Sequence, residues 1–381
     1  MDSRKNIYLQ IMALWQFLFR KENIMNYLTI VILVFSVLGA LDRMFGSRLG
    51  LGKEFDKAFM LLGTMALSMI GMIVISPLIA DVMKPLSEFF ANTLHIDPSV
   101  IPASLFANDM GGASLSVEMA TNEKIGMYNA LVVSSMMGCT VSFTIPFALG
   151  MVKKEQHKEL LLGILCGVVT IPVGCIISGF VCGIPFASLI AVLLPLVIFA
   201  VVIAFGLVRF QEFCIKAFKV FGYFITALIT AGLAMGVINF LSGKEVIRGL
   251  ATLEEGAMIC VNAAVVLSGS FPFMYIVSKL LAKPLKAVSG KIGVNEISVL
   301  GMVSCLVTSA TTFGMMDKMD KKGTVLNSAF AVSGAFALGS HLAFTMAFDE
   351  GYVAAVIAGK LVAGVLALLL ANVIYSKSRE L

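Results

Sequence analysis

The sequence predicts an all-α polytopic membrane protein of about nine to eleven transmembrane helices, built as inverted repeats with two broken or re-entrant segments. Three observations predict it: an apolar composition, a motif that recurs in both halves, and the distribution of basic residues among the loops. Of the 381 residues, 59% are hydrophobic and 13% are charged, whereas soluble domains contain about 45–50% apolar and 25% charged residues. A soluble fold of this length could not bury so much apolar surface, and this composition also excludes disordered and collagen-like chains.

Residues 1–24 differ from the rest because basic residues bracket a short apolar stretch. This N-terminal extension is either an amphipathic helix on the membrane surface or the product of a start codon assigned upstream of the true one at Met25. No small-residue cleavage site follows it, so a cleaved signal peptide is not expected.

Nine apolar stretches are long enough to span a membrane, since a crossing helix takes about 20 residues. They lie at 27–45, 57–80, 126–150, 160–182, 186–208, 214–241, 256–280, 323–347 and 351–375. Two further stretches, 98–119 and 296–316, are apolar but rich in small and polar residues. Irregular backbone is tolerated in a membrane where it lines a cavity, so these two are predicted to be broken or re-entrant.

A Lys-Pro-Leu motif at 84–86 recurs at 283–285, and similar features follow it in the same order. In each half an ambiguous segment comes next, then a short charged loop, and then an asparagine, Asn129 or Asn327, at the start of a serine-containing apolar span. This order predicts a duplication. The predicted organisation is a first transmembrane repeat at 25–182, a connecting transmembrane helix at 183–213 and a second repeat at 214–381.

The basic residues of the loops decide between topologies. If all eleven segments crossed the membrane, the two faces would carry nearly equal numbers of loop Lys and Arg residues. If 98–119 and 296–316 both re-enter, most of these residues fall on one face, as the positive-inside rule expects. This arrangement puts Met25 outside and the C-terminus in the cytoplasm. It also places an odd number of crossings between equivalent positions, so the two repeats are inverted, an architecture of secondary transporters.

Asp109 is the main candidate for a site residue, because it lies inside the first ambiguous segment. A carboxylate at membrane depth costs roughly 3 kcal/mol on insertion scales, so such groups are usually functional or paired. Gly111 and Gly112 permit a turn beside it, and Asn108 adds a neutral donor and acceptor. The segment predicts a cation-binding site; the alternative is a structural cap on a half-helix.

Four more residues are candidates for substrate binding or coupling. Glu118 approaches Asp109 only across a hairpin tip, and otherwise is a solvated loop acid. His341 lies within a predicted span, where a histidine binds substrate, relays protons or bonds a backbone carbonyl. Thr311 offers a hydroxyl in the second ambiguous segment. Lys360 lies in the middle of the last span, too deep to reach the surface easily, and either forms an intramembrane ion pair or takes part in transport.

Other classes of function lack the residues they need. The seven cysteines form no C-x-x-C pair, so neither a disulfide framework nor a metal site is expected. No glycine-rich nucleotide loop is present, which argues against a nucleotide-driven pump, and no cofactor is expected. The net charge of +5 reflects loop topology rather than nucleic-acid binding. The expected partners are membrane lipids and a small-molecule substrate, and a homo-oligomer is left open.

Motifs spread along the chain give a more specific indication. They are Ala-Leu-Asp-Arg at 40–43, Asn-Asp-Met-Gly-Gly at 108–112, Ser-Met-Met-Gly at 135–138, Ser-Phe-Thr-Ile-Pro at 142–146, Ala-Leu-Gly at 148–150, Thr-Ile-Pro-Val-Gly-Cys at 170–175, Phe-Gly-Met-Met at 313–316, Phe-Ala-Val-Ser at 330–333, Ala-Leu-Gly at 337–339, His-Leu at 341–342 and Gly-Lys-Leu at 359–361. With these motifs in order over about residues 25–375, the chain resembles EutH, the ethanolamine permease family of ethanolamine-utilisation operons. It departs from the family pattern at Asn108, at 308–311 and at Ser340.

The resemblance implies a permease, not an enzyme, that takes up ethanolamine across the bacterial cytoplasmic (inner) membrane as a facilitator or secondary transporter. Ethanolamine is a small cation at neutral pH with one hydroxyl, so it needs a carboxylate and a polar partner; Asp109, Asn108 and His341 supply these types. The alternatives are an ion-coupled carrier for another small amine or amino acid, an intramembrane enzyme, or a sensor. The sequence leaves proton coupling, sodium coupling and uniport open.

Overall fold

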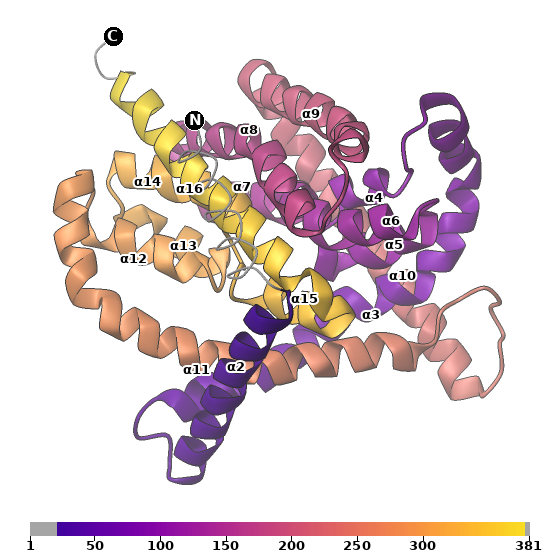
Figure 1. Ribbon diagram of the computed structural model, residues 1–381, viewed down its shortest axis with the longest axis horizontal. Helices are drawn as coiled ribbons and strands as arrows, with labels where there is room; N and C mark the ends of the chain where they lie inside the picture. Colours follow the sequence, from indigo (N-terminus) through magenta and orange to yellow (C-terminus); the bar gives the residue numbers. More distant parts are fainter. Residues whose placement is uncertain (1–20, 378–381) are drawn as a thin grey trace, which may run out of the picture.

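The structure, a computed structural model, describes residues 21–377, and within them all side chains except those of 21–26 and 281–288. The predicted N-terminal extension at 1–24 therefore lies outside the described residues, apart from its last four, with which helix α2 begins. Eight helical segments of the described chain are long and apolar enough to cross a membrane, and no strand occurs in this part of the chain. The predicted all-α polytopic fold is confirmed (Figure 1).

The two halves of the chain have a similar order of helices. The first contains α2 (Lys21–Met44), α3 (Leu51–Phe89), α4 (Val100–Leu105), α5 (Gly112–Met119), α6 (Glu123–Tyr128), α7 (Ile145–Met151) and α8 (His157–Val181), with π-helices Asn129–Gly138 and Thr140–Thr144 between α6 and α7. After α9 (Phe186–Arg209), the second contains α10 (Gln211–Ser242), α11 (Leu253–Ile292), α12 (Glu296–Cys305), α13 (Ser309–Gly314), α14 (Lys321–Ser333), α15 (Ser340–Asp349) and α16 (Val353–Lys377). The long helices α3 and α11 pack along each other, as do α8 and α16.

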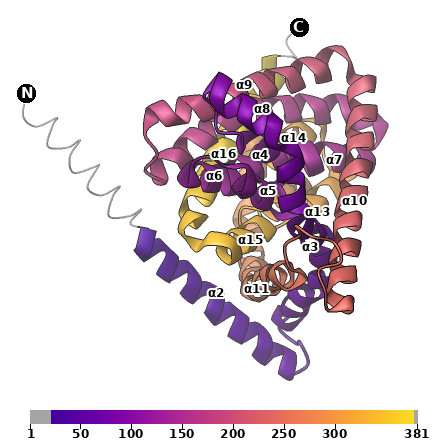
Figure 2. The same ribbon diagram turned by 90° about the vertical axis from the view of Figure 1, so that its right-hand side faces the viewer.

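Glycines allow the outer helices to cross the long helices closely. Helix α10 packs on α3 and α2 packs on α11, as Figures 1 and 2 show. A Cβ atom at Gly71 of α3 would collide with the carbonyl oxygen of Ile229, and one at Gly269 of α11 with that of Ile32. Small residues are the usual means of close helix approach in lipid. The two crossings occupy corresponding places in the two halves of the chain.

Both ambiguous segments are hairpins whose ends meet. In the first, α4 and α5, the Asp97 carboxylate accepts hydrogen bonds from the backbone N–H groups of Thr121 at 3.1 Å and Asn122 at 2.9 Å. In the second, α12 and α13, the Asn295 N–H donates to the Asp320 carboxylate at 3.0 Å. Each segment therefore enters and leaves at the same place, as a re-entrant segment must.

The asparagines at equivalent positions make equivalent contacts. The Asn129 amide donates to Ser99 Oγ at 2.8 Å, and the Asn327 amide donates to the Ser298 carbonyl at 2.8 Å. Each bond ties the start of a long buried segment to the base of the hairpin before it.

The span predicted at 323–347 is interrupted. Helix α14 ends at Ser333 and α15 begins at Ser340, with non-helical backbone between them. In this break the Phe336 N–H donates to the Cys305 carbonyl at 3.0 Å and the Leu338 N–H to the Leu306 carbonyl at 2.8 Å. The tip of the second hairpin thus replaces the helical bonds that the break loses. For this reason residues 21–377 contain eight apolar helices long enough to cross a membrane, whereas the sequence predicted nine.

Candidate substrate site

A cavity of about 270 Å³ lies where both hairpin tips, the break before α15 and the long helices α3 and α11 meet. Its polar lining is Thr64, Ser68, Asp109, Thr308, Ser340 and His341, and its aromatic lining is Phe143, Phe271 and Phe336. Both halves of the chain contribute polar groups. A small, mostly apolar cavity with a few converging polar groups is the usual form of a small-molecule site.

Asp109 is held at the tip of the first hairpin by a short 3-10 turn, Asn108–Met110. The turn ends at Gly111, whose φ of 94° lies in the left-handed region that glycine adopts without strain. On the other side, the Ala107 N–H donates to Ser142 Oγ at 3.0 Å, which anchors the tip to the neighbouring π-helix. The Asp109 side chain lines the cavity, is 20% exposed and has the Ser340 hydroxyl as a hydrogen-bonding partner.

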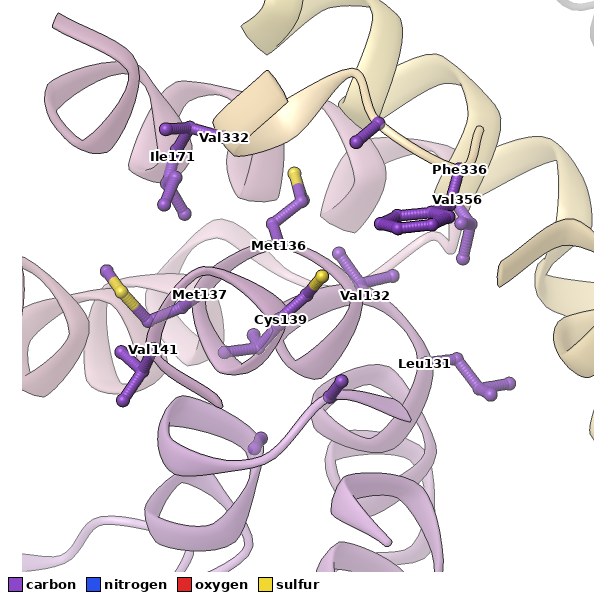
Figure 3. Close-up of a cluster of buried hydrophobic side chains, with 14 of the residues drawn as sticks. Leu131, Val132, Met136, Met137, Cys139, Val141, Ile171, Val332, Phe336 and Val356 are labelled. Atoms are coloured by element: carbon purple, nitrogen blue, oxygen red, sulfur yellow. The ribbon is translucent and has the colours of Figure 1, made fainter. Parts of the chain in front are cut away.

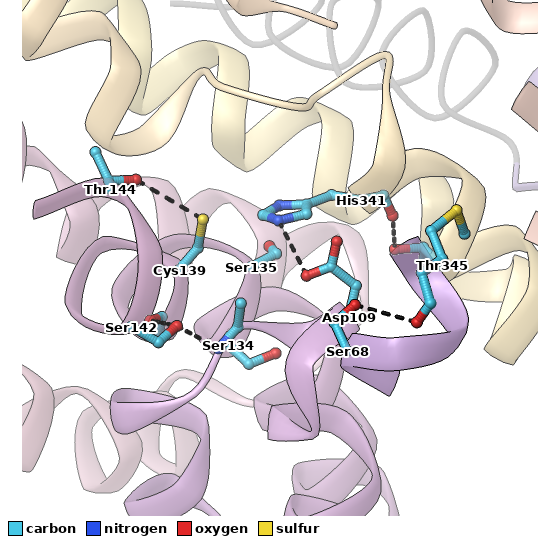
Figure 4. Close-up of polar contacts among 12 residues, drawn as sticks. Ser68, Asp109, Ser134, Ser135, Cys139, Ser142, Thr144, His341 and Thr345 are labelled. Atoms are coloured by element: carbon cyan, nitrogen blue, oxygen red, sulfur yellow. Dashed lines mark hydrogen bonds and ion pairs between the residues drawn. The ribbon is translucent and has the colours of Figure 1, made fainter. Parts of the chain in front are cut away.

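His341 lies beside Asp109 because the break before α15 turns the chain there. Its Nε2 is 3.7 Å from Asp109 Oδ1, and Figure 4 shows the imidazole directed toward this carboxylate. The imidazole stacks on Phe336, with ring centroids 4.9 Å apart and 30° between the planes. Sequence reasoning chose both Asp109 and His341, and the structure brings them together.

Lys360 joins this pair from the last helix, α16. Its Nζ donates to the Ser135 carbonyl at 2.6 Å and lies 3.1 Å from His341 Nδ1. The side chain is 1% exposed. No carboxylate among the described residues lies within ion-pair distance of Lys360, so its nearest negative charge, Asp109, is reached through the imidazole.

A cluster of buried apolar side chains lies in the same part of the protein as these polar groups. Figure 3 shows the cluster, in which Val132, Met136 and Met137 of the π-helix meet Ile171, Val332 and Val356. All are fully or almost fully buried. Such close packing fixes the polar side chains and keeps the local dielectric low, so their charges interact more strongly than in water.

Three predicted site residues lie elsewhere. Asn108 is buried beside the tip but outside the cavity lining, and neither polar atom of its amide has a hydrogen-bond partner among the described residues. Glu118 is exposed near the end of α5, and Thr311 is exposed on α13 in a neighbouring cavity of about 590 Å³. The part that these three take in binding stays a prediction.

Sequence reasoning missed the polar groups of the cavity on α3. Thr64 and Ser68 lie one turn apart on this helix, on the same face as Leu61. That spacing indicates a shared helix face. The sequence of a continuous apolar helix does not indicate, however, which of its faces lines a cavity.

Two larger cavities adjoin the central one. The cavity of about 590 Å³ shares Leu61, Phe271 and Thr308 with it and extends to Glu54 and Lys57 near the start of α3. Another, of about 620 Å³, shares its lining residues Met110 and Phe143 with the central cavity and extends to Lys219 and Tyr223 of α10.

Comparison with known proteins identifies the family. The family model described as "Ethanolamine utilisation protein, EutH" matches residues 24–374. The chain belongs to the EutH family. A relative from Listeria monocytogenes, named a probable ethanolamine permease EutH, is 39% identical over 337 residues, which is 88% of this chain and 90% of the relative.

Two further relatives extend the comparison. The Escherichia coli protein, also named a probable ethanolamine permease EutH, is 35% identical over 385 residues, covering 91% of this chain and 94% of its own. An uncharacterized protein of Bacillus subtilis, YxeR, is 36% identical over 337 residues, covering 88% and 91%. No solved structure matches the chain. The resemblance to EutH that the motifs indicated is therefore confirmed.

Proposed function

We propose that this EutH protein is a permease that takes up ethanolamine across the bacterial cytoplasmic membrane, as a facilitator or secondary transporter. The observation that carries the proposal is the Asp109 carboxylate, which faces a cavity between two hairpins in a chain of membrane-spanning helices. The names of the relatives from Listeria and Escherichia supply the substrate. The helical architecture supplies the transport class, because hairpin tips that meet in the middle of a bundle form the substrate sites of many secondary transporters.

The chemistry of the cavity suits a small hydroxylated ammonium ion. Its ammonium group donates to the Asp109 carboxylate, a charge-assisted hydrogen bond. Its hydroxyl reaches Thr308 or Ser340, which both line the cavity. The faces of Phe143 and Phe336 add cation–π attraction. The apolar remainder of the lining favours a short carbon chain over a larger polar molecule.

The adjoining cavities supply a route to one face of the membrane. Glu54, Lys57 and Lys219 lie at their far ends, and the loop-charge topology assigns these residues to the cytoplasmic side. A separate cavity at the base of the first hairpin, lined by His95 and Asp97, shares no lining residue with the central one. The proposed route therefore leads from the central cavity to the cytoplasm.

The proposal is tested by uptake of radiolabelled ethanolamine into proteoliposomes that contain the purified protein. We expect uptake above that of empty liposomes, with the substrate recovered unchanged, and a tenfold or greater loss in Asp109→Asn. The matched control is Asp81→Asn, which changes an exposed carboxylate of α3. Uptake no faster than in empty liposomes would refute the permease, and chemical conversion of ethanolamine would favour an intramembrane enzyme. Stronger competition by another amine or by an amino acid would reassign the substrate.

A further inference from the structure

Lys360 is a second charge in the centre of the protein, and ethanolamine binding as described above does not use it. We propose that Lys360 balances the charge of Asp109 in the empty carrier and loses its proton through His341 when an ethanolammonium ion binds. The permease then exchanges one substrate cation for one proton. This inference rests on the proposed function and adds its coupling.

The contacts of Lys360 determine the hydrogen-bonding state of the histidine. A protonated amine has donors and no acceptor, so at 3.1 Å His341 Nδ1 must accept from Lys360 Nζ. The ring hydrogen is then on Nε2, the atom that lies 3.7 Å from Asp109 Oδ1. In the empty carrier His341 is thus neutral, accepts from the ammonium group and directs its N–H toward the carboxylate.

Lys360 is connected to the cavity through the side chains of His341 and Asp109. Lys360 is 1% exposed, and the exposed fraction of the side chain is 2% for His341 and 20% for Asp109. Besides these two partners, the titratable side chains that face Lys360 are Cys139, Cys175 and Cys305, from the end of the π-helix, α8 and α12. Thiols have reference pKa values near 8.5 and so do not supply a negative charge at neutral pH. Asp109 is the carboxylate that faces Lys360 in the described part of the chain.

Counting charges shows what a second cation would do. The empty site holds one positive and one negative charge and is neutral. If ethanolammonium bound at Asp109 while Lys360 stayed protonated, the site would hold an unmatched positive charge among apolar side chains, which is strongly unfavourable. Loss of one proton from Lys360 restores neutrality while the substrate stays charged.

The proton leaves by a balanced step. The Lys360 ammonium transfers a proton to His341 Nδ1, and the Nε2–H bond breaks and releases its proton to solvent in the cavity. The products are a neutral amine at Lys360 and the other tautomer of neutral His341. Nε2 is now an acceptor that faces the cavity, so it takes a hydrogen bond from the bound ammonium ion. When the substrate leaves, the reverse step reprotonates Lys360, and no net charge crosses the membrane per cycle.

A purely structural role for Lys360 predicts a different order of variant effects than proton release does. If Lys360 only supplied a fixed positive charge, Lys360→Arg would be tolerated and Lys360→Gln would be harmful. If it must lose a proton, the order reverses, because arginine cannot be deprotonated in proteins. Glutamine keeps a donor for the Ser135 carbonyl and for His341 Nδ1. Because glutamine is neutral, the substrate ammonium alone then balances the charge of Asp109. We expect Lys360→Gln to bind ethanolamine and Lys360→Arg to bind it at least tenfold more weakly than the wild type.

The decisive measurement is calorimetric titration of the purified protein with ethanolamine at pH 7, in buffers that differ in ionisation enthalpy. We expect release of one proton per bound ethanolamine in the wild type and none in Lys360→Gln. Lys216→Gln, at an exposed position of α10, is the matched control and should behave as the wild type. Binding by the wild type without proton release, or equal release by Lys360→Gln, would overturn the proposal. Absence of both binding and uptake in the wild type would instead refute the proposed function, and this inference with it.

Uptake into proteoliposomes at a clamped membrane potential provides a second test. Wild-type uptake should be independent of the potential and accompanied by proton movement in the opposite direction. Lys360→Gln should move the substrate cation without a proton moving in the opposite direction. Any uptake by this variant should therefore increase when the interior of the liposome is negative. An inward positive current in the wild type, without counter-movement of protons, would contradict the exchange.

Discussion

The two hairpins share a structural plan but differ in the chemistry of their tips. Each is closed at its base by an aspartate, Asp97 or Asp320, and each is tied to the next buried segment by an asparagine. At the tips, the first hairpin presents the Asp109 carboxylate to the cavity and the second presents the Thr308 hydroxyl. The bases of the hairpins, which are alike, hold the fold together, whereas the tips, which differ, supply the polar groups of the site.

The segments that follow the hairpins differ in the same way. In the first half, π-helices carry the chain from Asn129 to Thr144 without a break. In the second half, the helix stops at Ser333, and the chain resumes with Ser340 and His341 beside Asp109. Two halves of similar helix order therefore hold an asymmetric site, with the carboxylate from one half and the imidazole and ammonium groups from the other.

Labelling from the two sides of the membrane tests whether the halves are inverted. Single cysteines at positions 90 and 123, in a background without the seven native cysteines, should react from outside the cell. Cysteines at positions 291 and 318 should react only from the cytoplasm, because both hairpins re-enter and an odd number of crossings separates them. Reaction of positions 90 and 123 from opposite faces would break the comparison and make the first hairpin a full crossing.

Substitutions at the two tips test the division of chemistry. Asp109→Asn should weaken ethanolamine binding about tenfold to a hundredfold, because a hydrogen bond to a charged group contributes about 1.5–3 kcal/mol. Thr308→Val should cost threefold to tenfold, since a neutral hydrogen bond contributes about 0.5–1.5 kcal/mol. Calorimetric titration of both purified variants measures the ratio. A larger loss in Thr308→Val would show that the second tip, not the first, anchors the substrate.

Substitutions at the bases of the hairpins test the shared plan. Asp97 accepts hydrogen bonds from the backbone and hydroxyl groups of Ser99 and Thr121 and from the Asn122 N–H. Asp320 accepts from the Asn295 N–H and from Ser298 Oγ. We expect Asp97→Ala to lower stability by roughly 3 kcal/mol and Asp320→Ala by about half as much. Thermal unfolding in detergent shows which variant loses more stability. A larger loss in Asp320→Ala would mean that the base of the second hairpin contributes more to stability than the base of the first.

Asn108 permits the mildest test, since its buried amide, next to Asp109, has no hydrogen-bond partner in the part of the chain that the structure describes. Burying an amide unpaired costs about 1–3 kcal/mol, so Asn108→Leu should raise the unfolding temperature by a few degrees. If Asn108 also contacts ethanolamine, as the sequence predicts, the same variant should lose affinity. Higher stability with unchanged affinity would leave binding on the first tip to Asp109.

The sequence predicted much of this fold because its signals are local. Apolar stretches, two polar interruptions and a repeated motif are legible along the chain, and Asp109, His341 and Lys360 are conspicuous as polar groups at membrane depth. The break before His341 was not predicted, because hydrogen bonds from the distant Cys305 and Leu306 carbonyls stabilise it. Thr64 and Ser68 were missed for a similar reason, because whether they line the cavity depends on which face of α3 is turned toward it.

The position of Lys360 after its partners in the chain has a consequence for biogenesis. A lysine in the middle of a transmembrane helix raises the insertion free energy by about 2.5–3.5 kcal/mol, and α16 is made after the other described helices. Ser135, Asp109 and His341 all precede it in the chain, so they are already made when Lys360 reaches the translocon. The charged side chain of α16 thus reaches the translocon when the Ser135 carbonyl and the His341 imidazole that bond it have been made, and removal of the segment that carries Ser135 should impair the insertion of α16.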